Sequence, residues 1–88
     1  MQVEFLSHFD KDLDKVNRKS VRLQIVRLIE QVEAADNISE VLNLKKLKGF
    51  RSAYRVRIGD YRVGFFLQGQ KVEFARVGHR KDIYKIFP

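Results

Sequence analysis

The sequence contains no cysteine and only two histidines, His8 and His79. Without thiolates the chain has neither a disulfide framework nor a cysteine metal site, and two histidines are too few for an ordinary zinc site. No apolar run approaches the roughly 20 residues that span a bilayer. The first residues also carry neither the cationic nor the apolar segment of a secretory signal. We therefore expect a cytoplasmic protein that uses no metal and no other cofactor.

The chain is short, and its length limits the number of domains. Its 88 residues predict a single domain over residues 1–88, because a second hydrophobic core could not be filled. The hydrophobic content of 44% and the aromatic content of 11% suit one packed core.

The positive charge is confined to one half of the chain. Residues 1–44 hold six Lys/Arg and eight Asp/Glu, a balance of −2, whereas residues 45–88 hold twelve and three, a balance of +9. Such asymmetry within one small domain indicates an anionic partner on one side. A basic surface binds nucleic acid through counterion release, or attracts an acidic protein by long-range steering. The alternative is a face that is merely solvated.

The first half predicts one strand and two amphipathic helices. Residues 3–6 are mostly apolar and partly β-branched, which is typical of a strand. Ser7, with Asp10 three residues later, resembles a capping box, and Ser20 is a candidate cap for a second helix that ends near Ala35. Apolar residues at helical spacing mark the two stripes: Phe9, Leu13 and Val16, then Val21, Ile25, Leu28, Ile29 and Val32. The two helices are expected to form an αα-hairpin.

The second half predicts a three-stranded meander. Residues 38–44 suit a short helical turn, and residues 45–52 suit a basic loop. Gly59-Asp60 and Gly69-Gln70 are two-residue connections with glycine first, which favours type II′ turns. The three strands that they join are expected at Ala53–Ile58, Tyr61–Leu67 and Lys71–Val77. The predicted fold is therefore α+β, with the helices on one face of the sheet.

The two turns fix a strand register and two sheet faces. The predicted pairs are Ile58 with Tyr61, Arg57 with Arg62, Val56 with Val63, Arg55 with Gly64, Leu67 with Val72, Phe65 with Phe74, and Gly64 with Ala75. One face is apolar and suits the helices, with Arg76 as an exception at its margin. The other face collects Arg55, Arg57, Arg62, Gly64, Phe66, Glu73, Ala75 and Val77.

The arginines on this second face are unfavourable unless an anion is bound. Arg57 lies directly opposite Arg62, and like charges at such positions are destabilising. Gly64 and Ala75 leave a shallow depression beside them that suits a phosphate, which arginine can contact with two hydrogen bonds. The alternative is that acidic neighbours neutralise the cluster, but Glu73 alone cannot balance three arginines. We expect this face to bind a polyanion, with RNA as the favoured candidate.

Two further residues are candidates for proton transfer near the arginines. His79 and Tyr84 follow the last predicted strand, and both carry side chains that exchange protons. In the alternative interpretation Tyr84, Ile83 and Phe87 dock the tail onto the core, and His79 lies in water at a strand end. His8, just after a helix start, is interpreted as structural.

The motifs together resemble those of RelE/ParE-type toxins. They are Leu47-Lys48-Gly49, then Tyr54-Arg55-Val56-Arg57-Ile58-Gly59-Asp60-Tyr61-Arg62-Val63, then Val77-Gly78-His79-Arg80, and then Tyr84. The resemblance spans the whole chain, since the N-terminal strand and the αα-hairpin fit the same RelE-like, microbial-RNase-type fold. In the RelE branch it implies a ribosome-dependent, metal-independent endoribonuclease that cleaves mRNA, inhibits translation and forms a hetero-oligomer with a cognate antitoxin protein.

The resemblance also implies roles for individual residues. Positive charges at Arg55 and Arg57 serve the reaction, whereas Arg62 and Arg80 hold the scissile phosphate. Tyr84 matches a C-terminal tyrosine that acts in the chemistry or stacks on a base, and His79 echoes a histidine of some relatives. The remaining cations match a basic loop that faces ribosomal RNA: Lys45, Lys46, Lys48 and Arg51.

Two alternatives and one departure from the family pattern stay open. The first alternative is a ParE-like inhibitor of DNA gyrase, and the second is a non-catalytic module that binds RNA or an antitoxin. The departure is that some relatives carry lysines where this chain has Arg55 and Arg57. Arginine stays protonated and is a poor base, so Tyr84 or His79 would have to transfer the proton here.

Overall fold

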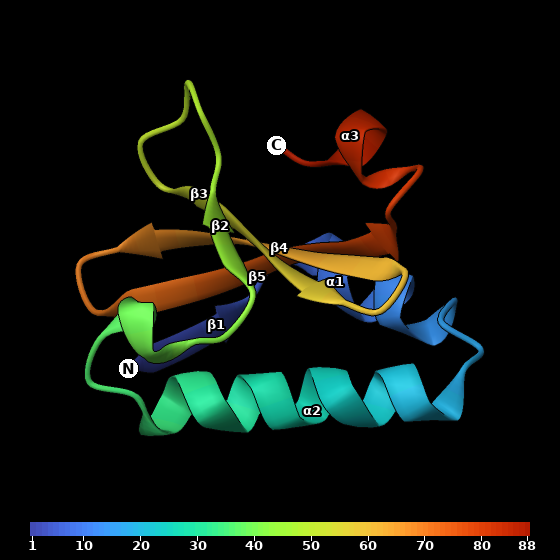
Figure 1. Ribbon diagram of the computed structural model, residues 1–88, viewed down its shortest axis with the longest axis horizontal. Coiled ribbons are helices and arrows are strands. Elements are labelled where there is room, and N and C mark those ends of the chain that lie inside the picture. Colours follow the sequence, from blue (N-terminus) through green and yellow to red (C-terminus); the bar gives the residue numbers. More distant parts are fainter.

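The computed structural model describes residues 1–88 and forms one five-stranded sheet with helices on both faces (Figure 1). Along the chain the elements are β1 (Gln2–Phe5), α1 (Ser7–Asp14), α2 (Lys19–Ala34), a 3₁₀ turn (Ile38–Glu40), β2 (Leu44–Lys46), β3 (Ala53–Ile58), β4 (Tyr61–Gln68), β5 (Lys71–His79) and α3 (Ile83–Ile86). None of the helices has the length and apolar character that crossing a membrane requires.

The strand order in the sheet is β1-β5-β4-β3-β2. Strands β5, β4, β3 and β2 pair with one another in antiparallel fashion, whereas β1 lies parallel to β5 at one edge of the sheet. This arrangement confirms the predicted α+β class, with the N-terminal strand, two consecutive helices and the meander in their expected places.

Strand β2 was not predicted. Residues 38–44 were expected to form a helical turn and residues 45–52 a loop, but only Ile38–Glu40 is helical, and Leu44–Lys46 pairs with β3. Three residues, two of them lysines, carry too little alternation to indicate a strand. The strand forms because the open edge of β3 offers it hydrogen-bonding partners.

The main core lies between the sheet and helices α1 and α2, which cover the same sheet face (Figure 1). Ile25 and Val32 of α2 and Phe9 of α1 are fully or almost fully buried in it. The strands contribute the apolar side chains Val56, Ile58, Val63, Phe65, Val72, Phe74 and Val77. The predicted stripes of both helices are thus the surfaces that pack on the sheet.

The two predicted serine caps are wrong. Ser7 is the first helical residue of α1, and Leu6 occupies the capping position without a side-chain hydrogen bond. Helix α2 likewise begins at Lys19 after Arg18, so Ser20 lies inside the helix. Both helices are held by their packing on the sheet rather than by side-chain caps, as is usual for amphipathic helices in proteins.

The first hairpin has the predicted register throughout. Arg57 lies opposite Arg62, and Arg55 lies opposite Gly64. The backbone dihedral φ is +57° at Gly59 and +60° at Gly69, and it is not positive at the residue after either glycine. A type II′ turn requires a positive φ at its first central residue only, so both turns agree with the sequence prediction.

The second hairpin contains a β-bulge that the sequence analysis missed. Phe65 and Phe74 pair as predicted, but Gly64 then pairs with Arg76, which leaves Ala75 as an extra residue. The predicted pair of Gly64 and Ala75 is therefore wrong, and so is the placement of Val77 on the arginine face. The bulge shifts the alternation by one residue, and Val77, instead of Arg76, enters the main core.

A second, smaller core fills the depression predicted at Gly64 and Ala75. Helix α3 packs there through Ile83 and Phe87, both at most 4% exposed. A Cβ atom on Gly64 would lie 2.4 Å from the ring of Phe87, so the missing side chain is the space that the ring occupies. The ring leaves no room for a phosphate at that position. It lies there because burial of an apolar ring is favourable.

Candidate functional site

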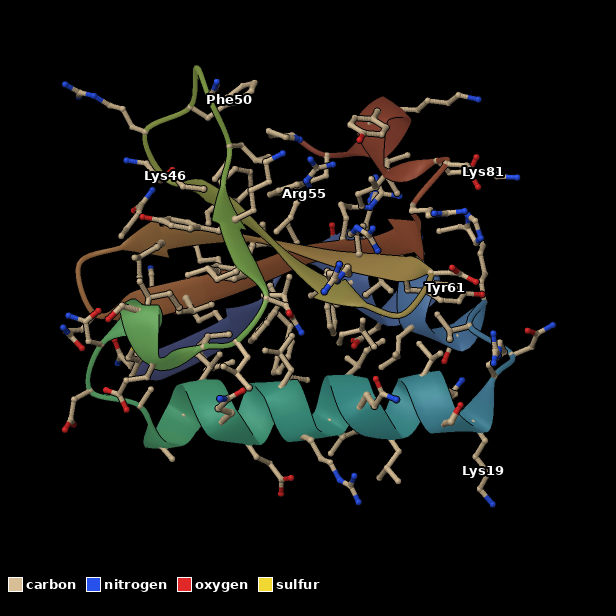
Figure 2. The ribbon with its side chains drawn as sticks, viewed as in Figure 1. Lys19, Lys46, Phe50, Arg55, Tyr61 and Lys81 are labelled. Atoms are coloured by element: carbon tan, nitrogen blue, oxygen red, sulfur yellow. The ribbon has the colours of Figure 1, made fainter.

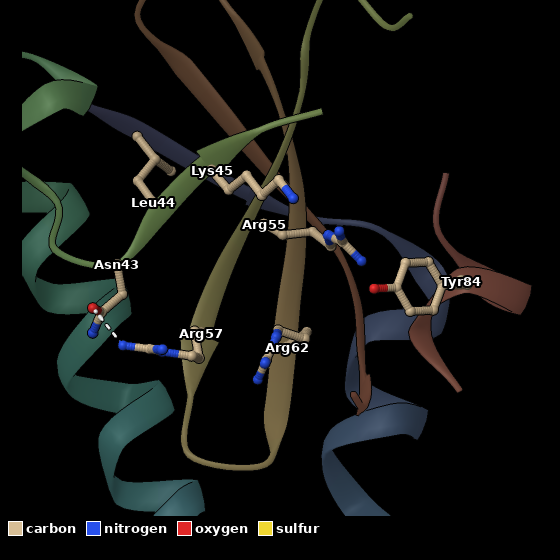
Figure 3. Close-up of a pocket in the computed structure, with 7 residues that line it drawn as sticks. All are labelled: Asn43, Leu44, Lys45, Arg55, Arg57, Arg62 and Tyr84. Atoms are coloured by element: carbon tan, nitrogen blue, oxygen red, sulfur yellow. Dashed lines mark hydrogen bonds between the residues drawn. The ribbon is translucent and has the colours of Figure 1, made fainter. Parts of the chain in front are cut away.

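The arginine face carries a cleft of about 340 Å³ between the sheet and α3 (Figure 3). Seven residues line this arginine cleft: Asn43, Leu44, Lys45, Arg55, Arg57, Arg62 and Tyr84. Three of the strands and α3 contribute to it, with the segment before β2 adding Asn43. The structure thus brings together the three arginines of the predicted cluster and the predicted tyrosine.

Asn43 orients Arg57. Its side-chain oxygen accepts a hydrogen bond of 3.4 Å from the Arg57 guanidinium (Figure 3), and its carbonyl accepts the Arg57 backbone N–H at 3.2 Å. Asn43 adopts a left-handed conformation with φ of 60°, the one non-glycine residue to do so. Asparagine tolerates this region better than most residues, which explains why the chain can turn here into β2.

Arg62 is held by backbone carbonyls. Its guanidinium donates to the carbonyl oxygens of Gly59 at 3.0 Å and Tyr61 at 2.9 Å. These bonds fix the side chain beside the β3–β4 turn and leave further N–H groups of the fork for another acceptor, since a guanidinium has five.

Arg55 contacts the tyrosine across the cleft. Its guanidinium carbon lies 4.9 Å from the centroid of the Tyr84 ring, within the range of a cation–π interaction. The hydroxyl of Tyr84 points from α3 toward the arginines (Figure 3). The Tyr84 side chain is 74% exposed, so a ligand in the cleft can reach it.

No carboxylate neutralises the cleft. The ion pairs of the molecule involve none of Arg55, Arg57 and Arg62. Glu73, the acid that the sequence placed on the same face, has a carboxylate oxygen 3.8 Å from the Lys71 amine instead. Three guanidinium groups and the amine of Lys45 therefore share one cleft without an acid. This arrangement suits a phosphate group or another anion with several oxygen atoms.

Helix α3 positions Tyr84, and its anchor is Phe87. Ile83 and Phe87 bury the inner side of the helix, while Tyr84 lies on its outer side. The approach of Phe87 leaves no space for a Cβ atom at Gly64, and a Cβ atom at Gly78 would lie 3.1 Å from the end of the Ile86 side chain. The alternative in the sequence analysis was that Tyr84, Ile83 and Phe87 dock the tail; in the structure Ile83 and Phe87 dock it, whereas Tyr84 is exposed.

Two predicted site residues lie outside the cleft. His79 ends β5, where its ring meets the edge of Tyr61 at 5.8 Å and its Nδ1 accepts the backbone N–H of Lys81 at 3.2 Å. The Arg80 guanidinium lies 3.9 Å from the carboxylate of Asp60 in the β3–β4 turn and is 57% exposed. Neither residue lines the arginine cleft.

The four cations of the predicted basic loop separate in the structure. Lys45 lies opposite Arg55 in the β2–β3 pair and lines the cleft. Lys46 alternates to the other sheet face, opposite Tyr54. Lys48 and Arg51 belong to the β2–β3 loop, whose tip carries Phe50 (Figure 2). The place of Lys45 in the cleft was missed because β2 was missed. Only the pairing of β2 with β3 brings Lys45 opposite Arg55.

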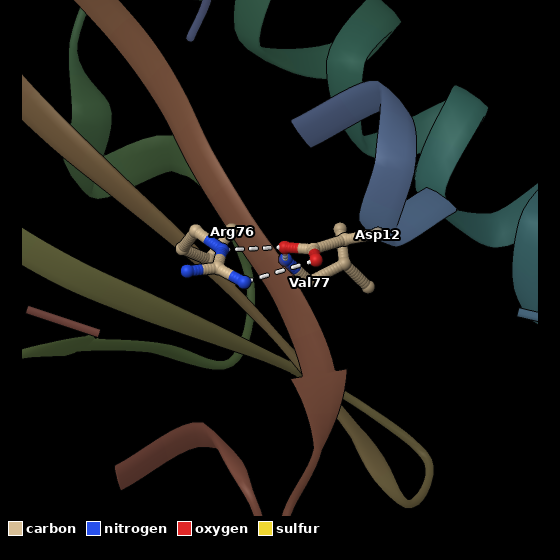
Figure 4. A network of polar contacts seen from close by, with 3 residues as sticks. All are labelled: Asp12, Arg76 and Val77. Atoms are coloured by element: carbon tan, nitrogen blue, oxygen red, sulfur yellow. Dashed lines mark hydrogen bonds and ion pairs between the residues drawn. The ribbon is translucent and has the colours of Figure 1, made fainter. Parts of the chain in front are cut away.

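A separate polar network lies at the free edge of β5 (Figure 4). Asp12 of α1, 7% exposed, accepts two hydrogen bonds from the Arg76 guanidinium, at 2.7 and 3.1 Å, and a third from the Val77 N–H at 3.0 Å. Strand β1 ends opposite Phe74, so Asp12 takes over a β5 donor that would otherwise be unpaired.

This network shifts the pKa values of both charged residues. Burial raises the pKa of Asp12, but the hydrogen bonds from Arg76 and Val77, with the positive charges of Arg76 and His8, more than offset it, and the pKa lies below its ordinary value of 3.8. The hydrogen bond to Asp12 raises the pKa of Arg76. Asp12 is therefore a structural anion, and the ion pair explains why Arg76 can lie beside the core.

The geometry of the fold and the cleft agrees with a known class of small proteins. Residues 3–84 match the family described as the ParE toxin of the type II toxin-antitoxin system parDE. The chain is also 39% identical, over the full length of both sequences, to Toxin RelE3 of Methanocaldococcus jannaschii. The chain belongs to the RelE/ParE family of type II toxins, as the sequence motifs indicated.

Solved structures share the fold. The toxin in a RelB-RelE antitoxin-toxin complex from Methanococcus jannaschii is 38% identical and superposes with a TM-score of 0.84, covering 97% of this chain and 99% of that one. The likeness extends to the archaeal RelE-RelB complex from Pyrococcus horikoshii, with a TM-score of 0.72, 22% identity, and coverage of 90% and 93%. At that lower identity the likeness concerns the fold alone.

Proposed function

We propose that this toxin is a ribosome-dependent, metal-independent endoribonuclease that inhibits translation by cleaving messenger RNA. The observation that carries the proposal is the arginine cleft, where Arg55, Arg57, Arg62 and Lys45 converge without an acid and Tyr84 points inward. A scissile phosphate meets the chemical requirements of such a site, because it gains negative charge in the transition state.

The reaction needs a base, an acid and cations. The 2′-oxygen of the RNA attacks the adjacent phosphorus and loses its proton to the base, while the bond to the 5′-oxygen breaks and that oxygen takes a proton from the acid. The products are a 2′,3′-cyclic phosphate and a 5′-hydroxyl. In this proposal Arg57 and Arg62 bind the phosphate oxygens, and Arg55 supports both the phosphate and the Tyr84 ring.

Tyr84 and Lys45 are the lining side chains that we propose for proton exchange, because arginine stays protonated. His79 has no part in this version, since it lies outside the cleft. Positioning of the RNA by the ribosome contributes further to the rate, because ordering of a substrate can lower the activation barrier by several kcal/mol. If Tyr84→Phe retains full cleavage in vitro, Tyr84 does not transfer a proton.

We further propose that the toxin forms a hetero-oligomer with a cognate antitoxin protein. The relatives from Methanococcus jannaschii and Pyrococcus horikoshii are in complexes of this kind. The basic half of this chain, with a balance of +9 over residues 45–88, favours an acidic segment in that partner. Co-purification of the chain with the product of an adjacent gene tests this point.

The decisive experiment is induction of the chain in cells, followed by primer extension on a translated mRNA. We expect cuts in phase with the codons that disappear when translation is blocked. The double variant Arg57→Ala/Arg62→Ala should lose the cuts and the growth inhibition while it still co-purifies with the antitoxin. A matched control, Arg18→Ala/Lys19→Ala, removes the same charge from exposed positions at the start of α2, away from the cleft, and should keep both. Full growth inhibition by the cleft variant would refute the proposal.

A second candidate function is inhibition of DNA gyrase, which the match to the ParE family favours. An inhibitor that binds gyrase as a protein has no need of an acid-free cleft for a phosphate, so we rank it below the nuclease. Supercoiling of plasmid DNA by purified gyrase separates the two. Inhibition of supercoiling by the wild-type chain, and equally by Arg57→Ala/Arg62→Ala, would favour the gyrase inhibitor.

A further inference from the structure

A second hollow, of about 470 Å³, adjoins the arginine cleft. It shares Lys45, Arg55 and Tyr84 with the cleft. Its other lining residues are Leu47, Lys48, Phe50, Phe87 and Pro88. We call this hollow the tail groove, because the C-terminal residues form one of its walls. The chain terminus lies between the β2–β3 loop and α3 (Figure 1).

Two exposed aromatic rings stand in this groove. Phe50 is 49% exposed and Tyr84 is 74% exposed, and they come from the β2–β3 loop and from α3. Neither ring packs against another aromatic ring of the protein, whereas each of the other phenylalanines and tyrosines has an aromatic neighbour. A half-exposed phenylalanine forgoes roughly 1 kcal/mol of burial, and its place in a lined hollow suits a planar ligand.

The charge of the groove selects among planar ligands. Lys45, Lys48 and Arg55 lie around the apolar walls, and no aspartate or glutamate side chain lines the groove. Aromatic rings combined with a positive groove are the usual means of binding single-stranded nucleic acid, in which the bases stack and the cations follow the backbone. The continuity with the arginine cleft through Arg55 and Tyr84 places such a base next to a phosphate in that cleft.

We propose that the tail groove binds an unpaired base of the RNA, adjacent to the phosphate that the arginine cleft holds. Phe50 stacks on this base, and Lys48 contacts its backbone phosphate. The inference rests on the proposed function insofar as the ligand of the cleft is RNA. It assigns Lys48 to the substrate strand, whereas the resemblance assigned it to ribosomal RNA.

The test is binding of a fluorescent single-stranded RNA of about six nucleotides, a length typical of such sites, measured by anisotropy at low salt. Its sugars carry 2′-O-methyl groups, so that the purified chain cannot cleave it. Phe50→Ala should weaken binding about tenfold, since removal of one stacking ring costs on that order. Phe50→Leu, which keeps the apolar volume but loses the ring, should weaken binding by a smaller factor.

The matched control is Phe5→Leu. Phe5 is also 49% exposed, but it lies on β1 at the far side of the sheet and packs on Phe9 and Phe74. This variant should bind the RNA like the wild type. A second matched pair is Lys48→Ala against Lys46→Ala, because Lys46 is a neighbouring lysine that does not line the groove. Only Lys48→Ala should lower the salt dependence of RNA binding, by about one unit in the slope of the logarithm of the binding constant against the logarithm of the salt concentration.

An RNA that lacks one base but keeps every phosphate separates stacking from charge. With the abasic position next to the bound phosphate, the wild type should lose about the factor that Phe50→Ala loses, and Phe50→Ala should lose nothing further. Equal binding by Phe50→Ala and Phe5→Leu would overturn the proposal. The same conclusion would follow if the wild type failed to bind the intact RNA, or if Phe50→Ala weakened only the antitoxin complex.

Failure of this inference is distinguishable from failure of the proposed function. Cleavage of mRNA on programmed ribosomes, with no effect of Phe50→Ala on RNA binding, would overturn the base site and leave the nuclease intact. Base-dependent binding at Phe50 without any cleavage would support the site and refute the nuclease.

Discussion

The two faces of the sheet treat charge in opposite ways. The face covered by α1 and α2 is mostly apolar, and at the edge of β5 beside it Arg76 is matched by the buried carboxylate of Asp12. On the face covered by α3, Arg57 and Arg62 lie opposite each other without any acid. The first face is organised for stability, whereas the opposed arginines of the second are by themselves unfavourable for the fold. The second face is therefore where function is to be sought.

The largest effect should follow from a truncation in the main core. Phe65 is fully buried, stacks on Tyr54 at 5.4 Å and meets Phe74 at 5.8 Å. Phe65→Ala should lower the free energy of unfolding by about 3–5 kcal/mol, measured by urea denaturation. The same truncation at half-exposed Phe5 should have a clearly smaller effect, and equal losses would contradict the assigned core.

The next effect concerns the smaller core under α3. Gly64→Ala places a methyl group within 2.4 Å of the Phe87 ring, which has to move. We expect a loss of about 2 kcal/mol in unfolding free energy and weaker RNA binding, because Tyr84 moves with the helix. Phe87→Leu should restore part of the stability in the double variant. If Gly64→Ala were as stable as the wild type and equally active, the ring would not anchor α3.

The contrast between the two cores also explains how far sequence reasoning reaches. The β3–β4 register is local, since it is fixed by Gly59 and by the alternation on either side, and it was predicted correctly. The bulge at Ala75 is different, because it depends on whether Val77 or Arg76 enters the core, and Asp12 decides this from 64 residues away. No local pattern encodes that competition.

The candidate site shows the same limit. Arg55, Arg57 and Arg62 were placed on one face by register alone, and the structure gathers them in one cleft with Tyr84. Asn43 was not foreseen, and Lys45 was expected only in a basic loop that faces ribosomal RNA, because both positions depend on a short edge strand that forms only against β3. The place of Tyr84 depends on how α3 packs across the sheet, which neither periodicity nor turn chemistry describes.

The Asp12–Arg76 pair predicts a pH dependence. Asp12→Asn should cost about 1–2 kcal/mol at neutral pH, less than for a fully buried pair because Arg76 is 26% exposed. The pKa of Asp12 is lowered in the folded state, so its contribution is present above the unfolded value of 3.8 and is lost as the pH falls through the folded pKa. Urea denaturation at several pH values should show the two proteins converging below about pH 4, and a constant difference would contradict the assignment.

The smallest effect sharpens the comparison of the two faces most directly. Because Arg57 and Arg62 repel each other across the strands, Arg57→Ala should leave stability unchanged or raise it by a few tenths of a kcal/mol, apart from the weak bond to Asn43. The same variant should lose RNA binding and cleavage. The conservative variant Arg57→Lys keeps the charge but loses the planar fork. It should therefore be as stable as the wild type and bind RNA better than Arg57→Ala but less well than the wild type. A marked destabilisation by Arg57→Ala, measured by urea denaturation, would show that the fold needs this arginine and that the two faces do not divide stability from function.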